Sequence, residues 1–188
     1  MRSALRSPLR YFVLLFLTLP IYASDGGRLA LDYGYFSLDA KVNGVTTRVS
    51  NPSAFRLTYL KPMNRSLEVF LGYSILLADF SGSDMGFGFD AGANFYPLGN
   101  STEERYKDTQ VEVRKFDLWR PYVGLGFHQR NFQSVKNSFA GIGASAGVER
   151  YLSEKYNLRA SARYITLGGS GDSSASELGV LFGIVVKL

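Results

Sequence analysis

The sequence contains no cysteine and a single histidine, His128. Without cysteine the chain cannot form disulfides, thiolate metal sites or a thiol nucleophile. One imidazole is also too few for the common zinc sites, which need several histidine or cysteine ligands. We therefore expect no metal site and no cofactor site.

The sequence also lacks an apolar run long enough for a membrane-spanning helix, which needs about 20 residues. Its longest run, residues 11–19, follows three arginines and is broken by a proline before Ala23. A basic start, a short apolar middle and a small residue at the end are typical of a secretory signal peptide. We predict a signal peptide over residues 1–23 and one mature domain over residues 24–188, with an uncleaved anchor as the alternative.

Positive charge is in small excess, and its position decides what it means. The formal net charge of +5 would by itself suggest a nucleic-acid partner. However, Arg2, Arg6 and Arg10 all lie in the predicted signal peptide, and no run of lysine and arginine follows on one face. Nucleic acid is not an expected partner.

Glycine and aromatic residues are abundant, with 20 Gly, 14 Phe and 12 Tyr. From residue 28 onward, apolar residues alternate with small or polar ones in stretches of about ten, separated by turn-forming residues. No segment keeps the 3.6-residue period of an amphipathic helix, so the predicted fold class is all-β. The predicted strands are residues 28–38, 54–61, 66–78, 84–96, 120–130, 138–151, 156–167 and 176–188.

The two faces of these strands differ in composition. One face is apolar, whereas the other holds mainly glycine and serine with isolated charges, and most lysines lie between strands. A sheet facing water would carry lysines along its outer face. We therefore expect the small and charged face to line a narrow lumen and the apolar face to contact lipid. The expected lumen charges are Asp32, Glu68, Asp90, Glu149 and Glu177, paired with Arg56, Arg159, Arg163 and Lys187.

These features predict an antiparallel transmembrane up-and-down β-barrel, because strands of about 9–11 residues span a bilayer and closure satisfies every backbone group. With eight strands, tight turns should follow strands two, four and six. Longer loops should follow strands one, three, five and seven. Residues 97–119 are too long for the second tight turn. They either prolong strands four and five or form an extra hairpin, so the strand count is eight or ten. An aromatic girdle is expected at the periplasmic ends, from Tyr59, Tyr96, Trp119, Tyr122, Tyr151 and Tyr156.

The mature sequence resembles the small outer-membrane β-barrel proteins of Gram-negative bacteria, the OmpA-like and opacity-porin-like eight-stranded group. The signal peptide, residues 91–97, 120–126 and 141–149, and the alternating last strand carry this resemblance. It implies a multi-pass protein of the outer membrane that contacts outer-membrane lipid and lipopolysaccharide and uses the barrel-assembly machinery during biogenesis. The family usually ends in an aromatic residue, whereas this chain ends in Leu188.

This fold does not determine function, because such barrels include adhesins, small pores, structural proteins and a few enzymes. The first hypothesis is a non-enzymatic protein with a structural, adhesion-type or weak small-pore role and no catalytic residue. Host or ligand contact would then fall in the polar loop 39–53, although the ligand is unknown.

Two alternatives stay open. A lipid A modifying enzyme on the same barrel would use His128, predicted near the extracellular rim, with Ser134 or Ser138 as a nearby hydroxyl. Such catalysis needs a nucleophile and an acid within hydrogen-bond reach of the imidazole. The sequence around His128 lacks the His-x-Ser-Asn pattern of the lipid A deacylases. The other alternative is a soluble, lipocalin-like periplasmic binding barrel with its apolar face turned inward.

Overall fold

The computed structural model describes residues 26–42, 44–48, 50–79, 84–99, 104–108, 111–115, 119–132 and 138–188. The signal peptide predicted at residues 1–23 lies outside this part of the chain and stays a prediction. No helix long enough and apolar enough to cross a membrane occurs in the described ranges. The strands there are β1 Arg28–Val42, β2 Val45–Arg48, β3 Ser50–Pro62, β4 Leu67–Asp79, β5 Asp84–Phe95, β6 Glu104–Asp108, β7 Val111–Lys115, β8 Trp119–Phe132, β9 Ser138–Tyr151, β10 Tyr156–Gly168 and β11 Ser174–Lys187.

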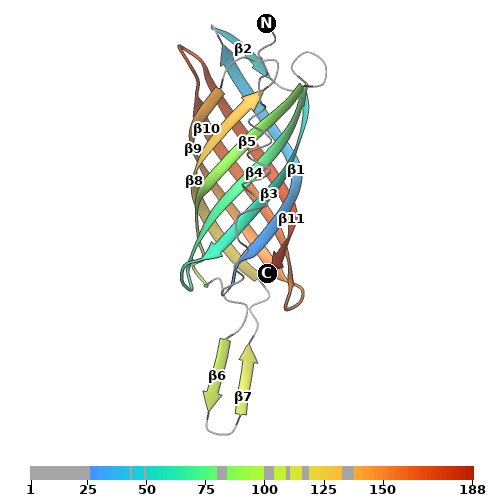
Figure 1. The fold of residues 1–188 in the computed structure, drawn as a ribbon, viewed down its shortest axis with the longest axis vertical. Coiled ribbons are helices and arrows are strands. Elements are labelled where there is room, and N and C mark those ends of the chain that lie inside the picture. The colour runs from blue at the N-terminus through green and yellow to red at the C-terminus, as the bar shows by residue number, and fades with distance from the viewer. Residues whose placement is uncertain are drawn as a thin grey trace, which may run out of the picture.

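Eight of these strands close into a barrel, in the order β11-β10-β9-β8-β5-β4-β3-β1, with β11 pairing back onto β1 (Figure 1). Every pairing is antiparallel, and the closing register runs from Arg28 opposite Lys187 to Lys41 opposite Ser174. The Leu188 amide then donates to the Gly27 carbonyl at 2.9 Å. The prediction of an eight-stranded antiparallel barrel is confirmed.

The barrel is tall enough to cross a membrane. Its strands have 12 to 15 residues. At about 3.4 Å per residue and a tilt near 40°, they rise about 30–40 Å, which covers the roughly 30 Å hydrocarbon core of a bilayer.

The lower rim is the one where β1 begins and β11 ends. Two of the three predicted tight turns lie there. The β3–β4 turn is closed by the Asn64 side-chain oxygen, which accepts from the Ser66 and Leu67 amides at 2.8 Å. The β9–β10 turn is closed by the Ser153 amide, which donates to the Tyr156 carbonyl at 3.0 Å.

The third turn at the lower rim is different. Between β5 and β8 the chain forms a separate two-stranded sheet of β6 and β7, which lies below the barrel (Figure 1). Of the two possibilities for residues 97–119, the extra hairpin is therefore correct. It adds no strand to the barrel, because β5 and β8 pair directly up to Phe95 and Val123.

The upper rim, where β1 ends, agrees only in part with the prediction of long loops. The first connection is long, but β1 continues to Val42 and returns as β2 through a turn in which Gly44 has a φ of +81°. This positive φ favours glycine. The prediction of longer loops was wrong for the last connection, which spans only residues 169–173, closed by the Gly169 amide donating to the Ser173 carbonyl at 2.8 Å. The other two connections, residues 80–83 and 133–137, are equally short in sequence and lie outside the described residues.

Candidate functional site

The outer wall of the barrel is apolar, as the alternation predicted. Leu125 is 72% exposed, Ile142 73% and Phe182 60%, and each lies in the middle part of its strand. Such a wall would aggregate in water but is stable in hydrocarbon. The structure therefore does not support the lipocalin-like alternative, in which the apolar face turns inward.

The lumen contains the buried charged side chains of the barrel and is therefore the candidate functional site. Within the described part of the chain, the buried charges there include all five carboxylates and the three arginines that the sequence had placed on this face. The full set of inward-facing charged residues is Asp32, Glu68, Asp90, Glu149, Glu177, Arg28, Arg56, Arg120, Arg130, Arg159 and Arg163. The predicted lumen residue Lys187 is instead exposed, because it is the last residue of β11 at the lower rim.

The lower cluster, formed by Arg28, Glu68, Tyr96, Arg120 and Glu149, lies just inside the lower rim. Glu149 accepts hydrogen bonds from Arg28 Nη1 and Arg120 Nη2, both at 2.6 Å. The other carboxylate, Glu68, forms an ion pair with Arg28. The Tyr96 hydroxyl lies within 3.0 Å of both carboxylates, at 2.9 Å from Glu149 and 3.0 Å from Glu68. Charges of opposite sign are thus paired, as burial requires.

The central cluster lies higher in the lumen and is built around Asp90, which is fully buried. This carboxylate accepts from Arg130 at 2.8 Å and from the Ser74 hydroxyl at 2.9 Å, and it lies 2.6 Å from His128 Nδ1. Arg56 completes its surroundings, with an Nε to Oδ2 distance of 3.1 Å. The neighbouring carboxylate of Glu177 accepts from Arg130 Nε at 2.8 Å and lies 2.5 Å from Arg163.

An apolar cluster fills the lumen between the central cluster and the upper rim. Its members come from seven of the eight barrel strands, so side chains from most of the circumference meet in the lumen. An eight-stranded barrel is only wide enough for side chains to fill its interior. The cluster consists of Phe36, Leu38, Ala40, Ala54, Leu76, Phe132, Phe139, Ile165, Leu167, Ala175 and Leu181.

His128 does not lie near the rim, and that prediction was wrong. Its side chain is buried in the lumen below the apolar cluster, because four more residues of β8 follow it before the strand ends. Ser134 lies outside the described residues, and Ser138 is exposed, with its hydroxyl 3.4 Å from the Gln129 amide. The hydroxyl in this region, Ser74, bonds to Asp90 rather than to the imidazole. In a catalytic relay the hydroxyl bonds to the imidazole and the imidazole bonds to the carboxylate. Here the hydroxyl and the imidazole both contact the carboxylate of Asp90, so the three groups do not form such a relay.

Two members of the predicted aromatic girdle point inward instead. Tyr96 and Tyr122 are buried, at 0% and 2% exposure, whereas Trp119 and Tyr156 are exposed on the outer wall as expected. The Tyr122 hydroxyl accepts from Arg159 Nε at 2.6 Å, and the guanidinium lies 4.6 Å from the ring centroid. Apolar rings thus fill the lumen while their hydroxyls hold charged groups.

The glycines of the inner face make room for these large side chains. A Cβ at Gly147 would lie 2.5 Å from the Tyr122 hydroxyl, and a Cβ at Gly143 would lie 2.8 Å from His128 Nε2. The predicted role of glycine in a crowded lumen is confirmed at these positions.

Sequence reasoning missed three of the lumen arginines. Arg28, Arg120 and Arg130 lie at or near the ends of predicted strands, where a charge is ordinarily read as solvated. Their position in the alternation was the available signal, because Arg120 and Arg130 fall in phase with Gly124 and Gly126 on the inner face of β8.

No protein-family model matches this sequence, and a comparison with curated protein sequences found none that matches. Solved structures do match. Neisserial surface protein A, from Neisseria, aligns at a TM-score of 0.57 with 17% identity, over 86% of this chain and 97% of that one. The outer membrane protease OmpT from Escherichia coli aligns at a TM-score of 0.51 with 5% identity, over 87% of this chain and 97% of that one. At these identities the likeness concerns the fold alone, which is that of an outer-membrane β-barrel.

Proposed function

We propose that this chain is a non-enzymatic integral protein of the bacterial outer membrane, whose closed barrel serves as a membrane-embedded scaffold. The observation that carries this proposal is the filled lumen. Two clusters of paired charges and an apolar cluster occupy the interior, so neither a solute path nor an open catalytic cleft is part of the described structure. Function then depends on the surfaces outside the lumen.

The apolar outer wall supports the membrane location. Since the wall is formed by alternate residues of all eight barrel strands, the whole circumference suits lipid rather than water. By the usual topology of such barrels, the lower rim would face the periplasm and the β1–β2 hairpin the outside, next to lipopolysaccharide. We further propose that the barrel-assembly machinery inserts the chain, with the outward-facing apolar residues of β11 as the region it recognises.

A conductance measurement tests the closed lumen. We expect purified protein in planar bilayers to show no stable open channel, because an ion would have to break both charge clusters and cross the apolar cluster. As a matched pair, Phe132→Ala thins the apolar cluster from inside, whereas Phe127→Ala changes only the outer wall five residues earlier on β8. Steady ohmic channels from the wild-type protein would contradict the proposal.

The enzyme alternative has less support, because His128 is buried and bonded to Asp90 beneath the apolar cluster. Mass spectrometry of lipid A separates the enzyme from the non-enzymatic scaffold. It compares cells that carry the wild-type gene, the His128→Ala variant and a full deletion. We expect three identical lipid A profiles. A modified species that disappears in both the variant and the deletion would establish the enzyme instead.

A further inference from the structure

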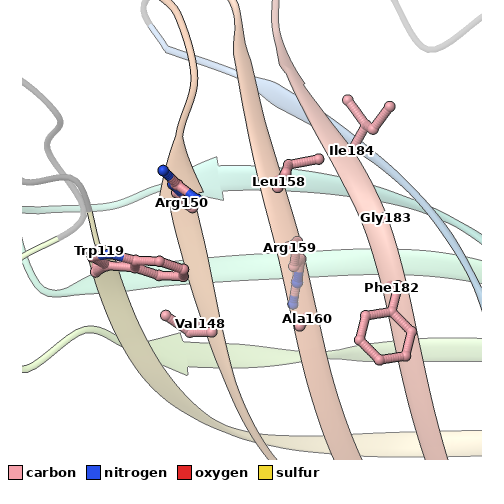
Figure 2. A pocket seen from close by; sticks show the side chains of 9 residues that line it. All are labelled: Trp119, Val148, Arg150, Leu158, Arg159, Ala160, Phe182, Gly183 and Ile184. Carbon is pink, nitrogen blue, oxygen red and sulfur yellow. The ribbon is translucent and has the colours of Figure 1, made fainter.

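The outer wall has a hollow near the lower rim that the proposed scaffold role does not use. Its volume is about 500 Å³, within the range of roughly 300–1,000 Å³ typical of pockets for small ligands. It lies across β8, β9, β10 and β11 (Figure 2). We call it the wall groove. Its lining includes Trp119, Val148, Arg150, Leu158, Ala160 and Phe182.

The registers explain why the wall is hollow at this place. Ala160 lies opposite both Val148 and Phe182 in the pairing of the three strands, so a small side chain is flanked by larger ones. Trp119 and Phe182 stand at the two sides of this floor in Figure 2, and they are 54% and 60% exposed. The floor and sides of the wall groove are therefore mainly apolar.

One end of the wall groove carries a positive charge. Arg150 lies opposite Trp119 in the β8–β9 register, and its guanidinium lies 5.1 Å from the centroid of the indole ring. This side chain is exposed and points outward, whereas the other arginines of the barrel wall point into the lumen, among the described residues. Arg150 is also the penultimate residue of β9, which places it at the depth where lipid phosphates lie if the lower rim is at the membrane surface.

We propose that the wall groove binds one glycerophospholipid of the inner leaflet, with an acyl chain over Ala160 and the phosphate on Arg150. The inference rests on the proposed membrane location. Arginine is well suited to phosphate because its guanidinium donates two parallel hydrogen bonds. A flexible acyl chain can fill a hollow, whereas a second copy of the barrel would present a convex wall and leave the hollow empty.

The single tryptophan of the chain, Trp119, makes occupancy measurable. The protein is placed in vesicles that contain a small fraction of phosphatidylglycerol brominated on an acyl chain, which quenches tryptophan fluorescence on contact. A brominated diacylglycerol with the same chains but no phosphate is the comparison. We expect about fivefold preference for the phospholipid, which is what one cation at a membrane surface, worth about 1 kcal/mol, corresponds to.

The variants test each part of the wall groove. Arg150→Gln should abolish the preference and Arg150→Lys should keep most of it. Lys61→Gln is the matched control, since Lys61 is also the penultimate residue of a barrel strand but lies outside the wall groove, and it should change nothing. Ala160→Phe fills the floor and should lower quenching by both lipids.

Three results would overturn the inference. Equal quenching by the two lipids would show that no phosphate is held, and displacement by inorganic phosphate alone would show an anion site without an acyl chain. A wild-type dimer in detergent that Ala160→Phe converts to a monomer would show that a second copy occupies the wall groove. Vesicle flotation reports membrane insertion separately, so failure of the proposed function would be seen as protein that does not float.

Discussion

Replacing Glu149 with glutamine removes one negative charge from the lower cluster while nearly keeping the size of the side chain. In the wild-type protein this carboxylate accepts from Arg28 and Arg120, both at 2.6 Å. After the change, Glu68 still faces Arg28. The amide oxygen of glutamine can accept from one arginine, but its NH₂ group then faces another donor. Arg120 would therefore be buried with its charge poorly compensated.

The size of the effect follows from that uncompensated charge. Removing one partner of a buried ion pair costs about 3–5 kcal/mol, and the lower figure applies here because Glu68 stays in place. We expect Glu149→Gln to reduce the free energy of unfolding by about 3 kcal/mol. The measurement is a reversible urea titration in phospholipid vesicles, followed by the fluorescence of Trp119, the one tryptophan of the chain.

Two further variants show whether the reasoning is correct. Glu154→Gln removes the same charge from the exposed β9–β10 turn and should change stability by less than about 0.5 kcal/mol. Combining Glu149→Gln with Arg120→Met removes both partners, and the double variant should be at least about 1.5 kcal/mol more stable than additivity predicts. If Glu149→Gln proved as mild as Glu154→Gln, the lower cluster would not be a set of buried paired charges.

Three other predictions concern the lumen glycines and the two hairpins. Gly147→Val should destabilise the barrel by about 1–3 kcal/mol in the same titration, because a Cβ there would lie 2.5 Å from the Tyr122 hydroxyl and no space exists for the larger side chain. Deleting residues 100–117 should leave vesicle flotation and barrel stability unchanged, since among the described strands β6 and β7 pair only with each other. In the β1–β2 hairpin, Arg48 bonds to Asp39 and lowers the pKa of that carboxyl, so the ion pair should persist at neutral pH and be lost only as the pH falls below about 4. Carboxyl NMR measures this titration.

Each of these has a control with a defined outcome. Ala144→Val places the same valine side chain on the outer wall of β9 and should be neutral in the titration, so equal losses at both positions would contradict the crowding argument. A barrel that fails to float without residues 100–117 would show that the lower hairpin takes part in folding. For the ion pair, Arg48→Gln should raise the pKa of Asp39, and an unchanged titration would mean that the pair does not form in solution.

The sequence was sufficient for the architecture because alternation fixes which face each residue takes, and the two faces must meet different surroundings. Register and closure follow from that constraint, since a slip of one residue would move Asp90 and its neighbours into lipid. The direction of side chains at strand ends was harder to predict from the sequence. Tyr96 and Tyr122 are amphipathic, so composition allowed an interfacial position, and only the space above glycines such as Gly147 shows that their rings fit inside.

His128 shows a second limit of sequence reasoning. Its inward direction was predictable from alternation, but its height in the barrel was not, because the strands extend further than their apolar alternation suggests. β8 continues to Phe132 and β1 to Val42, beyond the predicted ends at residues 130 and 38. Each added pair moves the upper rim outward, so a residue expected near the rim becomes buried. The contact between His128 and Asp90 is a long-range feature, which one sequence does not reveal.

A filled lumen also restricts where this protein can meet other molecules. Backbone groups of the barrel are satisfied by closure and most lumen charges by one another, so the interior has little left to offer a ligand. The surfaces that are not committed in this way are the β1–β2 hairpin, the β6–β7 hairpin and the wall groove. Of these, the β6–β7 hairpin has strand edges that pair with nothing else in the described structure, and isolated two-stranded hairpins are only marginally stable in water. Because β5 and β8 pair directly with each other, the barrel closes without a contribution from this hairpin.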